Sequence, residues 1–412
     1  MKKLLIIGYV WPEPKSSAAG SRMMQLIALF QQQQWQITFA SPATTGAHKA
    51  DLSDINEQTI ELNSSSFDDF VSKLQPEIVL FDRFMMEEQF GWRVEKHCPT
   101  ALRLLDTEDL HSLRQARHQA LKQNRAVEKR DLNSELAIRE VASILRCDLT
   151  LMVSSYEVAL LTNHFKVDPS LLHCLPFMLP PCQPKDSSWP SFEQRQHFIS
   201  IGNFRHAPNW DAVLQLKHII WPLIREQCQN AELHIYGAYP PPKATQLHNP
   251  AQGFLVKGWA EDAPQVMRHA RVCLAPLRFG AGIKGKLTEA MQNGTASVTT
   301  NIGAEAMHAE LPWNGAIEND PLAFAAAAIQ LYNDKAQWQQ CQQQGIDIIN
   351  QYYQAAPLAA QLISRLEQLS ATLEAHRLSN FSGAMLRHHS MKSTQYMAQW
   401  IAAKNALSAV EN

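Results

Sequence analysis

The sequence predicts an α/β fold made of two doubly wound, Rossmann-like domains that face each other across a cleft. Three observations support this prediction. Short apolar runs alternate with helical patterns in the first half of the chain, a proline-rich segment interrupts the alternation, and the alternation then restarts. Such alternation implies parallel sheets with right-handed crossovers, and parallel sheets bind ligands at the carboxyl ends of their strands.

The first predicted domain covers residues 1–175 and opens with a strand, a loop, a helix and a second strand. The segments that give this pattern are 4–8, 12–20, 23–30 and 35–40. Further strands are predicted at 77–81, 101–105 and 149–153. Each run is short, apolar and followed by polar residues, as expected of strands buried on both faces.

A predicted linker at 176–196 separates the domains, because its five prolines remove amide donors and fix φ. The second domain, at 197–375, has predicted strands at 197–202, 232–237, 254–258, 272–276 and 297–300 and helices at 210–225 and 286–292. A helical extension is predicted at 376–412. Its last segment, 394–410, places four apolar residues on one helical face that should pack against another element: Met397, Trp400, Ile401 and Leu407.

The composition indicates a globular protein without a strong charge. Of the 412 residues, 45% are hydrophobic and 18% are charged, and the net charge is −2 at pH 7. A general nucleic-acid binder carries a basic excess, so no nucleic-acid partner is expected. The lysines and apolar run at the start imitate a secretory signal, but the run is short and meets Pro12 and Pro14, so we expect a cytoplasmic protein.

The segment Gly280-Ala281-Gly282-Ile283-Lys284-Gly285 is the strongest local signal for a binding site. It follows a predicted strand and leads into a predicted helix. Glycines let the backbone approach a ligand closely, a helix start offers free N–H groups, and Lys284 and Lys286 add positive charge. The segment therefore predicts an anion site suited to a diphosphate, with a plain glycine-rich turn as the alternative. Its match to the dinucleotide pattern G-x-G-x-x-G is weak, because it comes late in its domain and no acid ends the next strand.

The second half resembles the donor domain of the group 1 nucleotide-sugar glycosyltransferases, which have the GT-B fold. The motifs follow in family order, and they are Ile201 to Asn209, Leu233 to Gly237, Gly258-Trp259 with Glu261-Asp262, Ala275 to Lys286, Glu289 to Met291, and Gly303 to Glu305. In the first half the resemblance rests only on Ala18 to Arg22 and on Asp106 to His111. It implies a hexosyltransferase-type enzyme of EC class 2.4 that moves a sugar, with retention, from a nucleotide-diphosphate sugar to a carbohydrate, lipid-linked or protein acceptor. It also implies that the C-terminal helices cross back to the first domain.

The resemblance assigns donor binding to Gly20, Gly202, Gly237, Trp259, Gly280, Gly282 and Glu289. A carboxylate such as Glu289 can accept hydrogen bonds from both ribose hydroxyls. The expected catalytic residues are Lys284, Arg205, His111 and Asp109. Lys284 and Arg205 would stabilise the departing diphosphate, Asp109 would orient an acceptor hydroxyl, and His111 would contact the donor.

Asp82 and Asp106 each follow a predicted strand and are expected on the acceptor side of the cleft. A structural alternative stays open for two residues: Asp106 equally fits a cap of the following helix, and His111 fits a surface residue.

Three departures from the family pattern leave other functions open. Ala281 stands where a glutamate is usual, and Asn203 and Pro208 stand where an arginine and a lysine are usual. The alternatives are a non-catalytic sugar-nucleotide-binding partner subunit, or an epimerase or phosphorylase of the same fold.

No metal or other cofactor is expected, because the sequence contains no Asp-x-Asp and its histidines lack ligand spacing. The seven scattered cysteines are expected to be reduced thiols. A basic stretch from Arg114 to Arg130 is interpreted as a solvated helix face, or alternatively as a weak contact with the inner face of a membrane.

Overall fold

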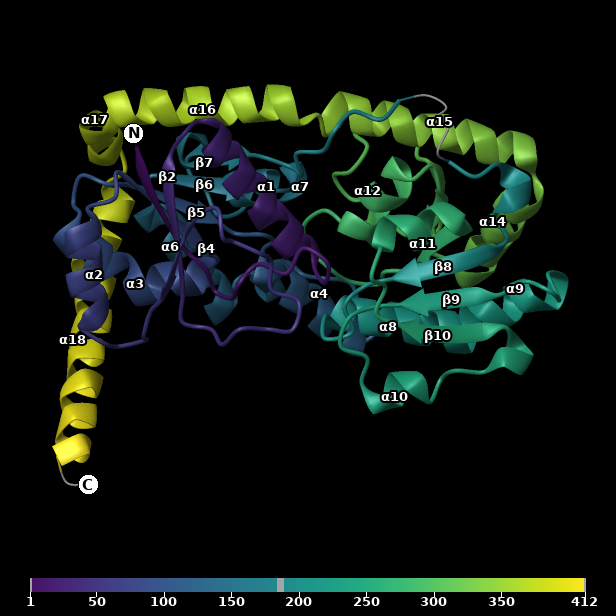
Figure 1. Ribbon diagram of the computed structural model, residues 1–412, viewed down its shortest axis with the longest axis horizontal. Coiled ribbons are helices and arrows are strands. Elements are labelled where there is room, and N and C mark those ends of the chain that lie inside the picture. Colours follow the sequence, from purple (N-terminus) through teal and green to yellow (C-terminus); the bar gives the residue numbers. More distant parts are fainter. Residues whose placement is uncertain (1, 184–188, 411–412) are drawn as a thin grey trace.

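The computed structural model describes residues 2–183 and 189–410, and it contains two parallel sheets with helices on both sides (Figure 1). Part of the predicted linker, residues 184–188, lies outside the described residues. The described parts of the linker contain only a bridge at Leu179 and one turn of 3-10 helix at Phe192–Gln194. The two sheets lie on either side of it.

The first sheet has the strand order β3-β2-β1-β4-β5-β6-β7, and all neighbouring strands are parallel. Its strands are β1 (Lys3–Ile7), β2 (Gln36–Ser41), β3 (Asn56–Thr59), β4 (Ile78–Asp82), β5 (Leu102–Asp106), β6 (Leu149–Met152) and β7 (Leu172–Cys174). The order reverses between β1 and β4, so their carboxyl ends form the switch point where open parallel sheets bind ligands.

The second sheet repeats this arrangement in the order β10-β9-β8-β11-β12-β13, again with parallel neighbours. Its strands are β8 (His197–Ile201), β9 (Leu233–Tyr236), β10 (Phe254–Gly258), β11 (Ala270–Ala275), β12 (Ala296–Thr299) and β13 (Gly315–Ile317). The switch point lies between β8 and β11. The predicted fold class, two doubly wound α/β domains with C-terminal helices, is confirmed.

The strands that sequence patterns missed are β3, β7 and β13. Each has only three or four residues, and the four residues of β3 are all exposed. Strands at or beside the edge of a sheet need no continuous apolar run, because they are not buried on both faces.

The helices of the first half are α1 (Ala18–Gln32), α2 (Ser66–Leu74), α3 (Phe84–His97), α4 (His111–Lys122), α5 (Lys129–Leu132), α6 (Glu135–Arg146) and α7 (Ser155–Asn163). Those of the second half are α8 (Ala207–Gln215), α9 (Trp221–Gln227), α10 (Pro242–Thr245), α11 (Ala263–His269), α12 (Gly285–Gln292), α13 (Asn301–Ala304), α14 (Pro321–Asn333) and α15 (Lys335–Tyr352). A π-helical stretch at Leu216–Ile220 joins α8 to α9, so the predicted helix at 210–225 is continuous. Pro222 lacks an N–H, which accounts for the wider turn before it.

The chain returns to the first half after α15, earlier than the predicted extension at 376–412. The backbone N–H of Leu179 donates to the carbonyl oxygen of Tyr353 at 2.7 Å, and that of Ala355 donates to the carbonyl oxygen of Leu179 at 3.0 Å. Helix α16 (Ala355–Ala371) begins there. Leu362, Leu366 and Leu369 of α16 are buried in the core cluster beneath the first sheet. Figure 1 shows α15 and α16 running along one side of both halves.

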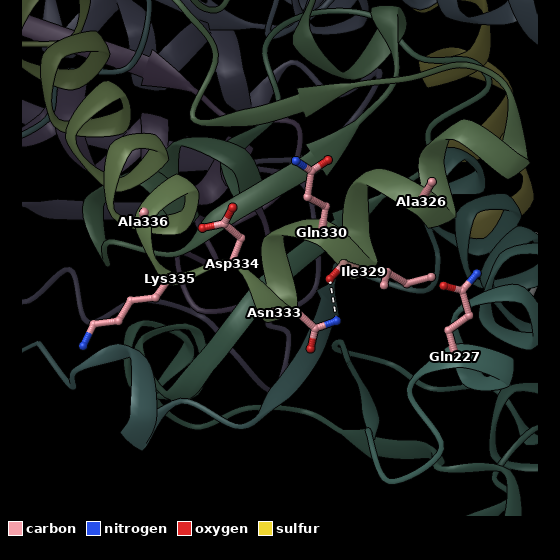
Figure 2. Close-up of a pocket in the computed structure, with 8 residues that line it drawn as sticks. All are labelled: Gln227, Ala326, Ile329, Gln330, Asn333, Asp334, Lys335 and Ala336. Atoms are coloured by element: carbon pink, nitrogen blue, oxygen red, sulfur yellow. Dashed lines mark hydrogen bonds between the residues drawn. The ribbon is translucent and has the colours of Figure 1, made fainter.

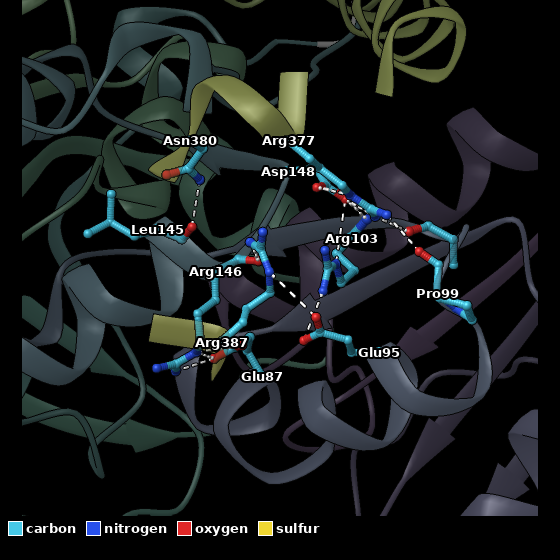
Figure 3. A network of polar contacts seen from close by, with 11 residues as sticks. Glu87, Glu95, Pro99, Arg103, Leu145, Arg146, Asp148, Arg377, Asn380 and Arg387 are labelled. Carbon is cyan, nitrogen blue, oxygen red and sulfur yellow. Dashed lines mark hydrogen bonds and ion pairs between the residues drawn. The ribbon is translucent and has the colours of Figure 1, made fainter. Parts of the chain in front are cut away.

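The last two helices, α17 (Leu373–Ser379) and α18 (Phe381–Val410), are anchored on the first half by polar contacts (Figure 3). Arg377 donates to both oxygens of the buried Asp148 at 2.8 and 2.7 Å and also to the carbonyl oxygen of Pro99 at 2.6 Å. Arg387 lies 3.6 Å from Glu95.

The expected packing of the final segment is wrong. Met397, Trp400 and Leu407 are 58%, 61% and 68% exposed, whereas Met391 and Ala398 form the buried face of α18 against Trp92.

An ion pair between Arg22 of α1 and Asp106 of β5 lies inside the first half. Arg22 Nη2 is 2.9 Å from Asp106 Oδ1, Nε donates to both carboxylate oxygens at 3.0 Å, and both side chains are at most 1% exposed. Asp106 is therefore enclosed, and the prediction that it lines the acceptor side is corrected. It does not cap α4 either, because Glu140 accepts from the first two N–H groups of that helix.

Replacing Arg22 with Met should lower the free energy of unfolding by about 3–5 kcal/mol, because Asp106 is then left buried without its partner. Urea denaturation of the two proteins measures the difference. The control is Lys335→Met, which removes an exposed partner of Glu193 and should leave the unfolding midpoint unchanged. A change below about 1 kcal/mol for Arg22→Met would show that the pair is not essential to this core.

Candidate functional site

The glycine-rich loop at 280–285 lies against the first half at three points. A Cβ on Gly282 would come within 3.0 Å of Asp109 Cβ, and one on Gly285 within 2.7 Å of Ala18 Cβ. The carbonyl oxygen of Gly280 accepts from Arg117 at 2.8 Å. The loop therefore lies at the boundary between the two halves, where the predicted diphosphate site is expected.

Two helices, one from each half, begin at this place. Ala18 is the first residue of α1 and Gly285 is the first residue of α12, and the two residues meet as described above. Among the described residues, the N–H groups of Gly285 and Lys286 have no hydrogen-bond acceptor. Two positive helix ends and free amides at one point suit an anion.

Lys284 is the residue just before α12, and its side chain is buried in the gap. Its Nζ donates to the carbonyl oxygen of Gly282 at 2.6 Å, which uses one of its three donors. Burial lowers the pKa of Lys284 to about 8, although the acids Glu305 and Glu157 oppose this shift. At neutral pH the ammonium is still the main form, and it is poorly solvated.

Lys286 is a second cation beside the loop, whereas Arg205 lies elsewhere. Lys286 Nζ donates to Asn209 Oδ1 at 2.8 Å and lies against Gly202, where a Cβ would come within 2.8 Å of it. Burial lowers the pKa of Lys286 to about 8. Arg205 instead stacks on the Tyr239 ring at 3.7 Å, so the predicted pairing of Arg205 with Lys284 is not observed.

Glu289 lies one helical turn after Gly285 on α12, about 6 Å further along the axis. Burial, with a smaller contribution from Asp262, raises the pKa of Glu289 to about 7. No group in the described ranges donates a hydrogen bond to its carboxylate, so it is available to accept from a ligand.

The edge of the gap next to β9 and β10 brings together the residues predicted around the base. Trp259 stacks on His48 of the first half, with ring centroids 4.6 Å apart. Gly237 has no room for a side chain, because a Cβ would lie 2.1 Å from the carbonyl oxygen of Gly202. Gly20 also has no room for a side chain, because a Cβ would lie 2.4 Å from the backbone of Glu13. Its role in the structure is to let the segment around Glu13 pack on α1.

Asp109 and His111 lie on the opposite wall, at the start of α4. Asp109 pairs with Arg114 and lies 3.6 Å from His111 Nε2. Burial alone would raise the pKa of Asp109, but Arg114 together with His111 and His206 holds it at about 2. Burial lowers the pKa of His111 to about 4, so its imidazole is neutral near pH 7. His111 is therefore a partly buried residue of the gap rather than a surface histidine.

Asp82, at the carboxyl end of β4, lies near an acid that sequence analysis missed, Glu108, which follows β5. These residues, with Tyr9 and Arg83, are called the floor of the first half. Asp82 accepts from the backbone N–H of Tyr9 at 3.0 Å and lies 3.8 Å from Arg83. Burial and the nearby Asp106 raise the pKa of Glu108 well above its usual value. Arg83 and Glu108 both have positive φ angles, of 71° and 64°, which non-glycine residues adopt mainly where the surroundings enforce them.

Two further residues missed by sequence analysis join the halves. Glu157 of α7 accepts from the N–H groups of Leu110 and Gly282 at 3.0 and 2.9 Å, and burial raises its pKa to about 8. Arg117 of α4 donates to both oxygens of Glu305 at 2.7 and 2.9 Å. Glu305 belongs to a family motif, but nothing in the sequence near Glu157 points to this contact.

The basic stretch from Arg114 to Arg130 is largely neutralised. Arg114 pairs with Asp109, Arg117 with Glu305, Arg125 with Asp131, and Arg130 with Glu128. The structure therefore favours the alternative without a membrane contact for these residues.

Within the described ranges no group of three or more His, Cys, Asp and Glu side chains is arranged to hold a metal ion. A shallow hollow of about 590 Å³ lies in the second half and is lined by residues of α9, α14 and α15 (Figure 2). None of the predicted site residues lines it. None of the helices in the part of the chain that the structure describes is long and apolar enough to cross a membrane.

Two doubly wound halves that bring helix starts and cations together suit a ligand with a diphosphate and a ribose. Residues 195–334 match the family of group 1 glycosyl transferases. No protein of curated function matches the sequence.

Several solved structures share the fold. Sucrose-phosphate synthase from Thermosynechococcus elongatus is 15% identical with a TM-score of 0.68, and the match covers 90% of this chain and 100% of that one. HepE from Anabaena, in complex with UDP-glucose, is 13% identical with a TM-score of 0.66 over 90% and 100% of the two chains. TarM, a protein of S. aureus, is 10% identical with a TM-score of 0.67 over 89% and 98%.

These findings confirm the predicted resemblance. Residues 195–334 are similar to the group 1 glycosyl transferases, and the whole chain shares the GT-B fold of the solved structures. The predicted enzyme class, a glycosyltransferase, agrees with the family match and with the fold.

Replacing Arg117 with Met should weaken the contact between the halves, because the loop at 280–285 and Glu305 lose their charged donor. We expect a larger radius of gyration in small-angle scattering and a loss of about 1.5–3 kcal/mol in the free energy of unfolding. Arg125→Met is the matched control, since Arg125 pairs with Asp131 within the first half. If both variants scatter like the unaltered protein, Arg117 does not hold the halves together.

Proposed function

We propose that this protein transfers a sugar from a nucleotide-diphosphate sugar to a hydroxyl-bearing acceptor, with retention of configuration and without a metal ion. The observation that carries the proposal is the meeting of the α1 and α12 starts, next to Lys284 and Lys286. The solved structures of Anabaena HepE, which are complexes with UDP and with UDP-glucose, support a nucleotide-sugar donor.

The donor would lie along α12. Its diphosphate would accept from the free amides at Gly285 and Lys286, and its ribose diol would donate to Glu289 one turn further on. The base would then lie toward Gly237 and Trp259. In this order the diphosphate lies at the start of α12 and the ribose lies at Glu289, about 6 Å further along the helix axis.

Negative charge develops on the β-phosphate as the glycosidic bond breaks. Lys284 has donors to spare and lies in a buried setting, where an electrostatic contact is stronger than in water. Two helix ends add positive potential at the same place. These groups stabilise the leaving nucleoside diphosphate without help from a metal ion, and the sequence contains no Asp-x-Asp to hold one.

Neither Asp109 nor His111 is a strong base for the acceptor's proton. Asp109 is held by Arg114, and the neutral imidazole of His111 has a pKa of about 4. The departing phosphate oxygen would then accept that proton on the same face of the sugar, which gives retention. Asp109 and His111 would orient the acceptor and the donor sugar, respectively.

A glycan is the acceptor that the floor of the first half suits best. The ring of Tyr9 is 40% exposed and lies beneath Arg83, and the carboxyls of Asp82 and Glu108 are close to them. Aromatic faces together with carboxyl groups and an arginine bind hydroxyl-rich molecules. A cytoplasmic location is part of the proposal, since the seven cysteines are free and mostly buried.

A non-catalytic binding subunit is the second candidate. It is favoured by Ala281, whose side chain packs against the core cluster of the first half at the position where relatives carry glutamate. Slow hydrolysis of the donor in the absence of acceptor separates the two, because a binding subunit releases no nucleoside diphosphate.

Lys284→Met tests the proposal directly. We expect kcat to fall by about 100-fold or more, because the cation at the leaving group is lost. Thermal stability should not fall, since Met fills a similar volume and leaves no buried charge. The donor for the assay is the nucleotide sugar that raises the melting temperature most.

Lys257→Met, which changes an exposed lysine of β10, is the control and should keep full turnover. Near-normal turnover of Lys284→Met would remove Lys284 from the mechanism.

A further inference from the structure

The outward face of α18 carries large apolar side chains that are half or more exposed. The exposed fractions are 77% for Phe381, 50% for Met385, 64% for Tyr396, 61% for Trp400 and 68% for Leu407. At 100° per residue, these positions fall within one stripe of the helix surface. Seven of the sixteen exposed large hydrophobic side chains in the described ranges lie between residues 378 and 407.

The helix is firmly attached to the first half by its opposite face, so loose attachment does not explain why the stripe is exposed. The opposite face holds Met391 and Ala398 against Trp92 of α3, and α18 also contacts α6. Asn380 donates to the carbonyl oxygen of Leu145 at 2.7 Å, and Arg387 lies beside Glu95 (Figure 3). These contacts fix the rotation of the helix, so the stripe cannot turn inward.

The position of α18 leaves the stripe accessible. Figure 1 shows the helix running down the outer edge of the first half, with its final turns extending past the neighbouring helices. It lies far from α12 and the loop at 280–285 in this view. A partner bound there would not block the gap between the halves.

The charged side chains of α18 within or beside the stripe are two lysines, Lys392 and Lys404. Arg377 and Arg387 lie on the packed side, next to Asp148 and Glu95 of the first half. Lys392 lies in the stripe between Met385 and Tyr396, and Lys404 Nζ is 5.5 Å from the centre of the Trp400 ring.

We propose that this stripe docks on the surface of a membrane that contains anionic phospholipids. Tyr and Trp favour the boundary between head groups and acyl chains, and lysines beside them attract anionic head groups. Self-association through the same stripe is disfavoured, because it would bring Lys392 and Lys404 of two α18 helices together and the stripe itself contains no Asp or Glu. The proposal concerns attachment and does not depend on the donor chemistry proposed above.

The test is co-sedimentation of the full-length protein with vesicles. We expect binding to vesicles of equal phosphatidylglycerol and phosphatidylcholine, and much weaker binding to phosphatidylcholine alone or in 0.5 M salt. The double variant Tyr396→Gln/Trp400→Gln should bind about a hundredfold more weakly, because burying each ring contributes about a tenfold gain. Both side chains are exposed, so the melting temperature should be unchanged.

Leu322→Gln is the matched control, since Leu322 is 66% exposed on the second half and should bind vesicles like the unaltered protein. Lys392→Glu is a second variant, expected to lose the preference for phosphatidylglycerol. Unchanged binding of the double variant, or no binding of the unaltered protein to either vesicle, would overturn the proposal. So would a dimer in sedimentation velocity that the double variant abolishes while vesicles remain unbound.

Discussion

The close approach of Gly285 to Ala18 is the constraint on which the rest of the site depends. It brings together the starts of α12 and α1, and it requires that no side chain stand at position 285. Gly282 meets Asp109 for the same reason. Because the two sheets have the same strand order, their switch points supply both helix starts, and the anion site is a consequence of the repeated fold.

Burial makes the charges of this site unusual and also balances them. The cations Lys284 and Lys286 are less stable than in water, so their pKa values fall, whereas those of Glu157 and Glu289 rise. Glu157 and Arg117 use this setting to connect the loop at 280–285 to the first half. The bonds that keep the halves together therefore lie beside the groups that would hold the donor, so binding and closure are coupled.

Sequence patterns predicted the interior of the fold better than its edges and its contacts between halves. The central strands are continuous apolar runs, whereas β3, β7 and β13 are too short or too polar to be detected. The glycine loop was predicted because its residue types carry the chemistry. The enclosure of Asp106 by Arg22 and the contacts of Glu157 depend on residues far apart in the chain, which local patterns do not report. Apolar spacing on α18 predicted a packed face but could not distinguish the buried side from the exposed one.

A crystal structure with a nucleoside diphosphate sugar bound tests the central claim most directly. We predict the diphosphate at the starts of α1 and α12, beside Ala18 and Gly285, with amide nitrogens at the start of α12 and Lys284 Nζ within about 3 Å of its oxygens. The ribose hydroxyls should reach the carboxylate of Glu289. A nucleotide found outside the gap, or one bound there with Lys284 still turned to the carbonyl of Gly282 and Glu289 untouched, would contradict the account.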